Sequence, residues 1–117
     1  MTKVLYIGIL DTVPSQMVPV LVAHSVMNAD TAYQDRERYA EAVDRYLDWK
    51  LNSFRKCTLS VNEKEFGRLC QLHPGVFTGY ENTVLGGAPS CVIPLPYNRE
   101  DRPNVLRYAR LWEPQQS

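Results

Sequence analysis

The stretch VLYIGIL at residues 4–10 decides the fold of this chain. It is a continuous apolar run rich in strand-forming side chains, and the first charged residue after it is Asp11. Such a run predicts a strand covered on both faces, because a strand with one face in water alternates apolar and polar residues. We therefore expect this strand in the middle of a sheet, with helices on both sides.

Two helices are expected to follow this strand. After a loop, apolar residues recur at helical spacing over residues 15–29, with Ser15 as the candidate N-cap and Pro19 in the first turn. A second apolar stripe with charges on its other side predicts a helix over residues 35–47. The aromatic and apolar residues at 49–54 are expected in a connector that packs on the core.

The second half of the chain is expected to alternate strands and helices. Ser60 and Glu63 have the spacing of a capping box, which predicts the start of a helix that ends near Leu72. Pro94 cannot donate a backbone hydrogen bond, so the strand that contains it is expected at a sheet edge or to be irregular. The expected strands are residues 57–59, 76–80 and 91–95, and the last helix begins at Asn98 or Asp101 and ends near Leu111.

The expected order of elements is β-α-α-β-α-β-β-α, in a single domain over residues 1–117. A helix between successive strands implies parallel crossovers, and the last two strands can be antiparallel. The expected fold class is therefore α/β, a small mixed four-stranded sheet with helices on both faces. A chain of 117 residues has one core, because it buries roughly two thirds of its unfolded surface.

Composition limits the classes of function. Thirteen basic and thirteen acidic side chains give a formal net charge of zero, which counts against a protein whose binding depends on neutralising many phosphates. The arginines and acids of residues 99–110 fit a solvated helix face, although a local basic patch stays open. No cluster of His, Cys, Asp and Glu has metal-ligand spacing, so neither a metal nor a cofactor is expected.

The three cysteines, Cys57, Cys70 and Cys91, are odd in number and form no CxxC pair. This pattern argues against a disulfide framework and fits a reducing cytoplasm. The apolar run at residues 4–10 is too short for a signal-peptide core or a membrane span. A cytoplasmic protein that does not contact a membrane is expected.

The sequence resembles the type II peptidyl-tRNA hydrolases and related small proteins with their fold. The likeness covers nearly the whole chain: an apolar first strand, the step Ala23-His24-Ser25 in the first helix, and the segment 79–96. That segment aligns without a gap, placing Thr83 on the family's threonine and residues 86–89 on its Gly/Pro turn. The resemblance implies a peptidyl-tRNA hydrolase II-like fold with a site that accepts the end of a tRNA.

The same alignment implies a degenerate catalytic site. His24 and Thr83 match the family's residues in place, and Glu81 lies two residues from the position of its aspartate. The family's lysine, catalytic aspartate and last-strand threonine correspond here to Met17, Gly79 and Cys91.

Two functions fit these residues. The first is a small-ligand binding protein that holds a nucleotide or nucleotide-like molecule, one use of which would be to sequester that ligand. The second is a hydrolase of the ester in peptidyl-tRNA or a related acyl ester. There His24 or Glu81 would activate water, and Thr83 or a backbone amide would stabilise the oxyanion. A tRNA partner is the less favoured ligand because the chain has no excess of positive charge.

The expected ligand contacts lie after the first strand, on the first helix and around the Gly/Pro turn, since open α/β sheets bind ligands at the ends of their strands. They are Asp11, Thr12, His24, Tyr80, Gly86 and Gly87. Some also have a plain structural interpretation: His24 as a hydrogen-bonded core or surface histidine, and Gly86-Gly87 as an ordinary turn. Cys91 and His73 are interpreted as a core thiol and a surface turn residue. A third class of function is a homodimeric interaction module, joined through a sheet edge or a tyrosine-bearing helix.

Overall fold

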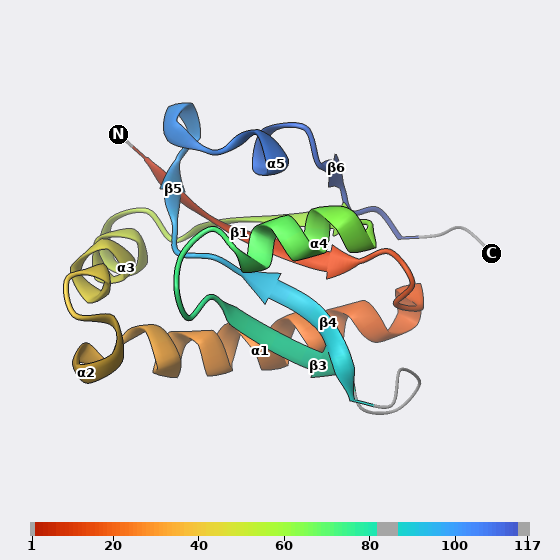
Figure 1. Cartoon of the computed structure of the whole chain (residues 1–117), viewed down its shortest axis with the longest axis horizontal. Helices are drawn as coiled ribbons and strands as arrows, with labels where there is room; N and C mark the ends of the chain where they lie inside the picture. Colours follow the sequence, from red (N-terminus) through yellow and green to blue (C-terminus); the bar gives the residue numbers. More distant parts are fainter. Residues whose placement is uncertain (1, 82–86, 115–117) are drawn as a thin grey trace.

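The apolar run at residues 4–10 forms the central strand of an α/β fold with a mixed six-stranded sheet (Figure 1). The structure is a computed structural model that describes residues 2–81 and 87–114. Its strands are β1 (Lys3–Leu10), β2 (Arg55–Val61), β3 (Phe77–Glu81), β4 (Ala88–Ile93), β5 (Tyr97–Asn98) and β6 (Arg110–Leu111). Its helices are α1 (Val18–Tyr33), α2 (Arg36–Tyr39), α3 (Ala42–Asn52), α4 (Glu63–Cys70) and α5 (Asn104–Arg107), with 3₁₀ turns η1 (Ser15–Met17) and η2 (Arg99–Asp101).

The strand order is β3-β4-β1-β2-β6, and β5 pairs with one end of β1. β1 lies between parallel β2 and antiparallel β4, and β3 is antiparallel to β4. The central position of β1, the parallel crossover to β2 and the antiparallel late pair are therefore confirmed. The expectation of four strands is wrong, because β5 and β6 add two residues each and are too short to show a periodic pattern.

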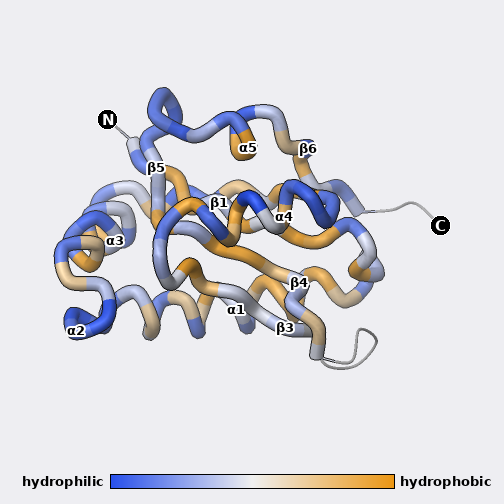
Figure 2. Tube along the Cα trace, viewed as in Figure 1, coloured by the Kyte–Doolittle hydropathy of each residue, from blue (hydrophilic) through white to orange (hydrophobic). Residues whose placement is uncertain are grey.

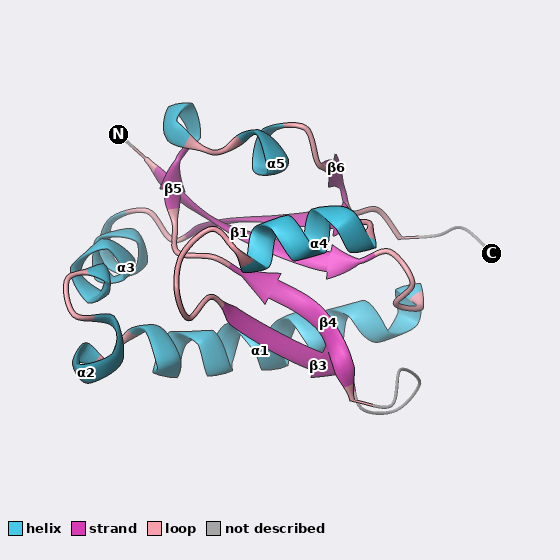
Figure 3. Ribbon diagram, viewed as in Figure 1, coloured by secondary structure: helices cyan, strands magenta, loops and turns pink. Residues whose placement is uncertain are grey.

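Helices cover both faces of the sheet, as expected (Figure 3). Leu5, Ile7 and Ile9 of β1 point into a core cluster shared with α1 and α3, while Tyr6 points to the opposite cluster with α4 and α5. Side chains alternate along a strand, so an unbroken apolar run supplies both clusters at once. Figure 2 shows this run as hydrophobic and the short helix α2 as strongly hydrophilic.

The single helix expected over residues 35–47 is wrong. Ala40 has a positive φ of 47°, which separates α2 from α3, and α3 continues through Trp49 and Leu51 to Asn52. The first helix is longer than expected and ends at Tyr33. Ser15 does not cap it, because residues 15–17 form a separate 3₁₀ turn before α1.

The capping box lies two residues later than expected. Asn62 Oδ1 accepts from the Glu65 amide at 2.8 Å, and Glu65 Oε1 accepts from the Asn62 amide at 3.0 Å. Ser60 instead belongs to β2, where it pairs with Ile9. The strand continues because Val61 fills the core, and the polar Asn62 is the first residue able to cap the helix.

The C-terminal part differs most from expectation. The expectation of one last helix from Asn98 or Asp101 to near Leu111 is wrong: only the short α5 forms, flanked by η2 and β6. The strand β4 lies between β3 and β1 rather than at an edge, and it ends at Ile93, immediately before Pro94. Ala88 and Pro89, expected in a turn, pair with Glu81 and Tyr80 as part of β4.

Candidate functional site

Gly79 and Cys91, two of the positions singled out in the sequence by the resemblance, are partners across β3 and β4. A Cβ added at Gly79 would overlap the Ser25 hydroxyl of α1 and lie 3.1 Å from Ser25 Cβ and 3.5 Å from Cys91 Cβ. Ser25 is buried and hydrogen-bonds the Cys91 thiol. Burial raises the pKa of Cys91 to about 12, which keeps it protonated. This region is filled with side chains, and Met17 lies at the edge of the same cluster.

The expected catalytic residues are only partly described. His24 is exposed on α1, next to Ser25, which faces Gly79 of β3. Glu81 pairs with Ala88 through its backbone at the end of β3. Thr83 lies outside the described residues. The structure therefore shows no joint geometry for these three groups.

The expected ligand-binding residues are spread over separate places. Asp11 and Thr12 are exposed in the turn after β1, and Asp11 lines a small pocket of about 50 Å³ together with Glu113. Tyr80 is exposed, and its hydroxyl lies 3.4 Å from Thr78 Oγ1 along the same strand. Gly87 forms a turn with φ 81°, and Gly86 lies outside the described residues.

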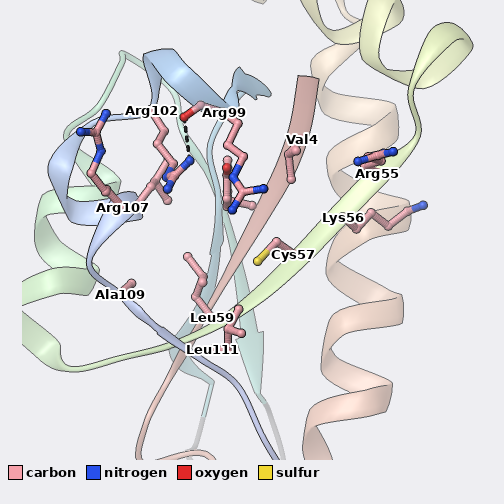
Figure 4. Close-up of a pocket in the computed structure, with 12 residues that line it drawn as sticks. Val4, Arg55, Lys56, Cys57, Leu59, Arg99, Arg102, Arg107, Ala109 and Leu111 are labelled. Atoms are coloured by element: carbon pink, nitrogen blue, oxygen red, sulfur yellow. Dashed lines mark hydrogen bonds between the residues drawn. The ribbon is translucent and has the colours of Figure 1, made fainter. Parts of the chain in front are cut away.

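A larger pocket of about 420 Å³ lies on the face of the sheet opposite to α1 and α3 (Figure 4). We call it the basic pocket. Its walls come from β1, β2 and the C-terminal segment 99–111, which crosses this end of the sheet. The lining residues are Val4, Tyr6, Arg55, Lys56, Cys57, Leu59, Arg99, Arg102, Leu106, Arg107, Ala109 and Leu111.

Five of the twelve lining residues are cationic, and none of the twelve is acidic. The ion pairs among the described residues are Lys3–Asp48, Arg36–Asp44 and Lys50–Asp30, and they use none of these five cations. Acidic residues adjacent in sequence, Glu100 and Asp101, are exposed and do not line the pocket. The basic pocket therefore holds a concentrated positive charge in a chain whose net charge is zero.

Arg102 is held in place by two contacts. It donates from Nη1 to the carbonyl of Arg99 at 2.7 Å and hydrogen-bonds the Tyr6 hydroxyl. Burial raises the pKa of Tyr6 and of Cys57, while Arg102 and Arg99 oppose that shift in both. Both groups are thus neutral at physiological pH, and the positive charge of the arginines is not cancelled by the floor of the pocket.

The two β2 cations are arranged differently from the arginines of residues 99–107. Lys56 Nζ lies 3.3 Å from the centre of the Phe54 ring and donates to the Phe54 carbonyl at 2.9 Å. Burial lowers the pKa of Lys56. Figure 4 shows Lys56 directed away from Arg99 and Arg102, so the three arginines carry most of the charge that a bound anion would meet.

The sequence contains the residues of this site but gives only one local sign of it. Arg99, Arg102 and Arg107 fit a solvated helix face when a continuous helix is assumed. The interruption of that helix turns their segment across β1 and β2, next to Arg55. The one available signal is the pair Pro103 and Asn104, since proline and asparagine often interrupt regular structure.

Within residues 2–81 and 87–114, no group of three or more His, Cys, Asp and Glu side chains is placed to hold a metal ion. Cys57, Cys70 and Cys91 are free thiols. No helix in the described part of the chain has the length and apolar character needed to cross a membrane. No protein-family model matches the chain, and no curated protein matches it at a significant level.

Proposed function

We propose that this chain is a small-ligand binding protein and that its ligand is a nucleotide or nucleotide-like anion held in the basic pocket. The observation that carries the proposal is the lining of the basic pocket: five cations, no carboxylate and an apolar floor. Arginine guanidinium groups bind phosphate oxygens in pairs of charge-assisted hydrogen bonds. A phosphate-bearing ligand is therefore the chemistry that best fits this lining.

The size and floor of the basic pocket favour a ligand with an uncharged part as well. Its volume of about 420 Å³ lies within the range of roughly 300–1,000 Å³ of small-molecule sites. Leu59, Leu106 and Leu111 line it together with Tyr6. Figure 4 shows Leu59 and Leu111 at the end away from the three arginines. A nucleotide would fill the basic pocket with its base or sugar against the apolar end and its phosphate against the arginines.

The packed contact of Ser25, Gly79 and Cys91 supports binding rather than hydrolysis. On the resemblance to the type II peptidyl-tRNA hydrolases, Gly79 stands where a catalytic aspartate is expected, and no side chain fits there without moving Ser25. Sequestration of the ligand is the use we propose for a site of this kind. Ester hydrolysis through His24, Glu81 and Thr83 stays a prediction, tested by loss of acyl-ester cleavage in His24→Ala.

The test is a thermal-shift and calorimetric titration with a panel of nucleotides, using Arg99→Gln/Arg107→Gln and Arg36→Gln/Arg68→Gln. Both double variants remove two exposed arginines, but only the first pair lines the basic pocket. A ligand that binds the native state raises its Tm. We expect a Tm shift in the native chain and in the control, and binding at least about tenfold weaker in the pocket variant, because charge-assisted bonds contribute about 1.5–3 kcal/mol. Equal binding by both variants would contradict the location.

We also propose a cytoplasmic homodimer, as the sequence suggests. Among the described strands, β3 stands at one end of the strand order, and Tyr80 on it is 52% exposed. An edge strand offers backbone groups that can pair with a second copy. Light scattering distinguishes a mass of 13.4 kDa from twice that value, and a monomer at all concentrations would contradict the homodimer.

A further inference from the structure

Three arginines lie at one end of the basic pocket, on a single segment of the chain. Arg99 is the first residue of the segment 99–111, and Arg107 is the last residue of α5. Arg102, between them, hydrogen-bonds the Arg99 carbonyl and the Tyr6 hydroxyl. We propose that this arginine cluster selects a terminal phosphomonoester in its dianionic form and discriminates against a phosphodiester. This inference rests on the proposed function and specifies the chemical class of its ligand.

The charge and donor count of the arginine cluster support this selection. Each guanidinium carries five N–H donors and stays protonated at any physiological pH. A terminal phosphate offers three acceptor oxygens and a charge of about −1.5 to −2 at pH 7. A phosphodiester offers two free oxygens and one charge. The guanidinium groups of Arg99 and Arg102, with Arg107 on the same segment and no carboxylate in the lining, therefore favour the monoester in both charge and hydrogen-bond number.

No residue that lines the basic pocket is expected to change its charge between pH 5 and 7.5. A pH dependence of binding in this range would therefore come from the ligand. The lining contributes no His, Asp or Glu. Its titratable groups are Tyr6 from β1 and Cys57 and Lys56 from β2, beside the permanently charged Arg55. Tyr6 and Cys57 have raised pKa values, so neither gains charge in this range. The nearby carboxylates Glu100 and Asp101 are exposed and outside the lining.

The second ionisation of a phosphomonoester has a pKa of about 6, whereas a phosphodiester has no such step. Binding of the dianion should therefore strengthen as the pH rises through this value. The affinity for adenosine 5′-monophosphate is expected to rise about tenfold from pH 5 to 7.5, following the dianion fraction. The affinity for cyclic adenosine monophosphate should stay constant over the same range.

The experiment is a calorimetric titration of the full chain with these two nucleotides, adenosine and inorganic phosphate, at pH 5, 6 and 7.5. Arg102→Gln and Arg99→Gln are compared with Arg36→Gln, which lies on α2 and outside the basic pocket. Arg99 is exposed, so its variant keeps the test valid if Arg102→Gln fails to fold. We expect the monophosphate to bind at least about tenfold more tightly than the cyclic form at pH 7.5, since one charge-assisted bond contributes about that factor. Both pocket variants should remove this preference.

Each outcome decides between the two proposals. Equal affinity for the monoester and the cyclic diester, or a flat pH profile for the monoester, overturns the selection while leaving nucleotide binding in place. Inorganic phosphate binding as tightly as the nucleotide supports the selection of the dianion and overturns the nucleotide part of the proposed function. If no nucleotide and no phosphate binds, the proposed function and this inference fall together.

Discussion

The two faces of the sheet are covered in different ways. On one face, α1 and α3 fill the space completely: Tyr33, Tyr46 and Trp49 are each at most 1% exposed. On the other face, α4 covers part of the sheet and the segment 99–111 covers the rest, leaving the basic pocket. Long helices pack closely against a sheet, whereas a segment of short turns leaves space that charged side chains can line. The candidate site is therefore on the less regular face.

The two candidate locations for the ligand lie on different faces of the sheet. The family resemblance points to the filled face, where Gly79 touches Ser25. The electrostatics point to the open face, where Arg99, Arg102 and Arg107 gather.

An aspartate at position 79, where the resemblance would put one, should disrupt the filled face. Gly79→Asp is expected to lower the free energy of unfolding by about 4 kcal/mol or more, because it combines overpacking with the burial of a carboxylate. Gly79→Ala isolates the steric part and should cost about 1–3 kcal/mol. The contact that causes both losses is with Ser25. Urea unfolding measures each value.

The matched control is Gly67→Ala on the exposed side of α4, where an added Cβ meets nothing within 4 Å. This change should stabilise the protein by up to about 1 kcal/mol, since alanine is the better helix former. If Gly79→Ala were as well tolerated as this control, the filled face would be less closely packed than we describe.

His73 should make the filled face sensitive to acid. It is partly buried rather than a free surface residue, and its Nε2 accepts from the Leu95 amide at 3.0 Å. Burial lowers the pKa of His73, with Arg45 adding to the shift and the Pro74 carbonyl opposing it. The unfolded chain then binds more protons than the native state below pH 6.5, the ordinary histidine value. Stability should fall as the pH drops from 6.5 through the folded-state pKa and level off below it.

Urea unfolding between pH 4.5 and 8 measures this slope, and His73→Gln is the matched variant because its side-chain oxygen can still accept from Leu95. The variant should lose the histidine part of the slope. His73→Ala should cost about 1–3 kcal/mol near pH 7.5, because the Leu95 amide loses its acceptor. An unchanged slope in His73→Gln would mean that another group causes the acid sensitivity.

Thiol reactivity should report the difference between the faces directly. Cys57 lines the basic pocket and is partly exposed, whereas Cys91 is fully buried with a pKa raised to about 12. In a Cys70→Ser variant, which removes the other partly exposed thiol, an anionic disulfide reagent should label one site in the native state. Bound nucleotide should slow that reaction severalfold, and Cys91 should react only on unfolding. Equal labelling with and without nucleotide would contradict a ligand at this place.

The smallest effect is expected far from both locations. Arg36 and Asp44 form an exposed ion pair at 3.1 Å, with side chains 62% and 74% accessible. Arg36→Gln should change the free energy of unfolding by at most about 0.5 kcal/mol, because exposed pairs contribute little. Its nucleotide affinity should equal that of the native chain. A loss of affinity would show that net charge, rather than the arginine cluster, controls binding.

Much of the sheet is predictable from local pattern, because the run at residues 4–10 must lie in its centre and helices must cover both faces. Other features depend on contacts that the pattern does not contain. The break at Ala40 requires a positive φ, which alanine rarely adopts, so no local signal announces it. The sequence pattern predicts a capping box at Ser60, but Val61 is buried in the core, so β2 continues and Asn62 caps α4 instead.

The candidate site is less predictable than the fold. Arg55 on β2 and the arginines of residues 99–107 are distant in sequence and become neighbours only when the C-terminal segment crosses the sheet. A zero net charge conceals this local concentration. The residues expected from the resemblance, such as His24 and Thr83, rest on alignment with a motif, which does not report where charge gathers.

The most direct test of the central claim is a nuclear magnetic resonance titration of the ¹⁵N-labelled chain with adenosine 5′-monophosphate. The amide signals of Tyr6, Cys57 and Arg102 should shift, and those of His24 and Tyr80 should stay in place. This result would locate the ligand in the basic pocket. Shifts confined to His24, Tyr80 and their neighbours would contradict the account and place the ligand where the family resemblance puts it.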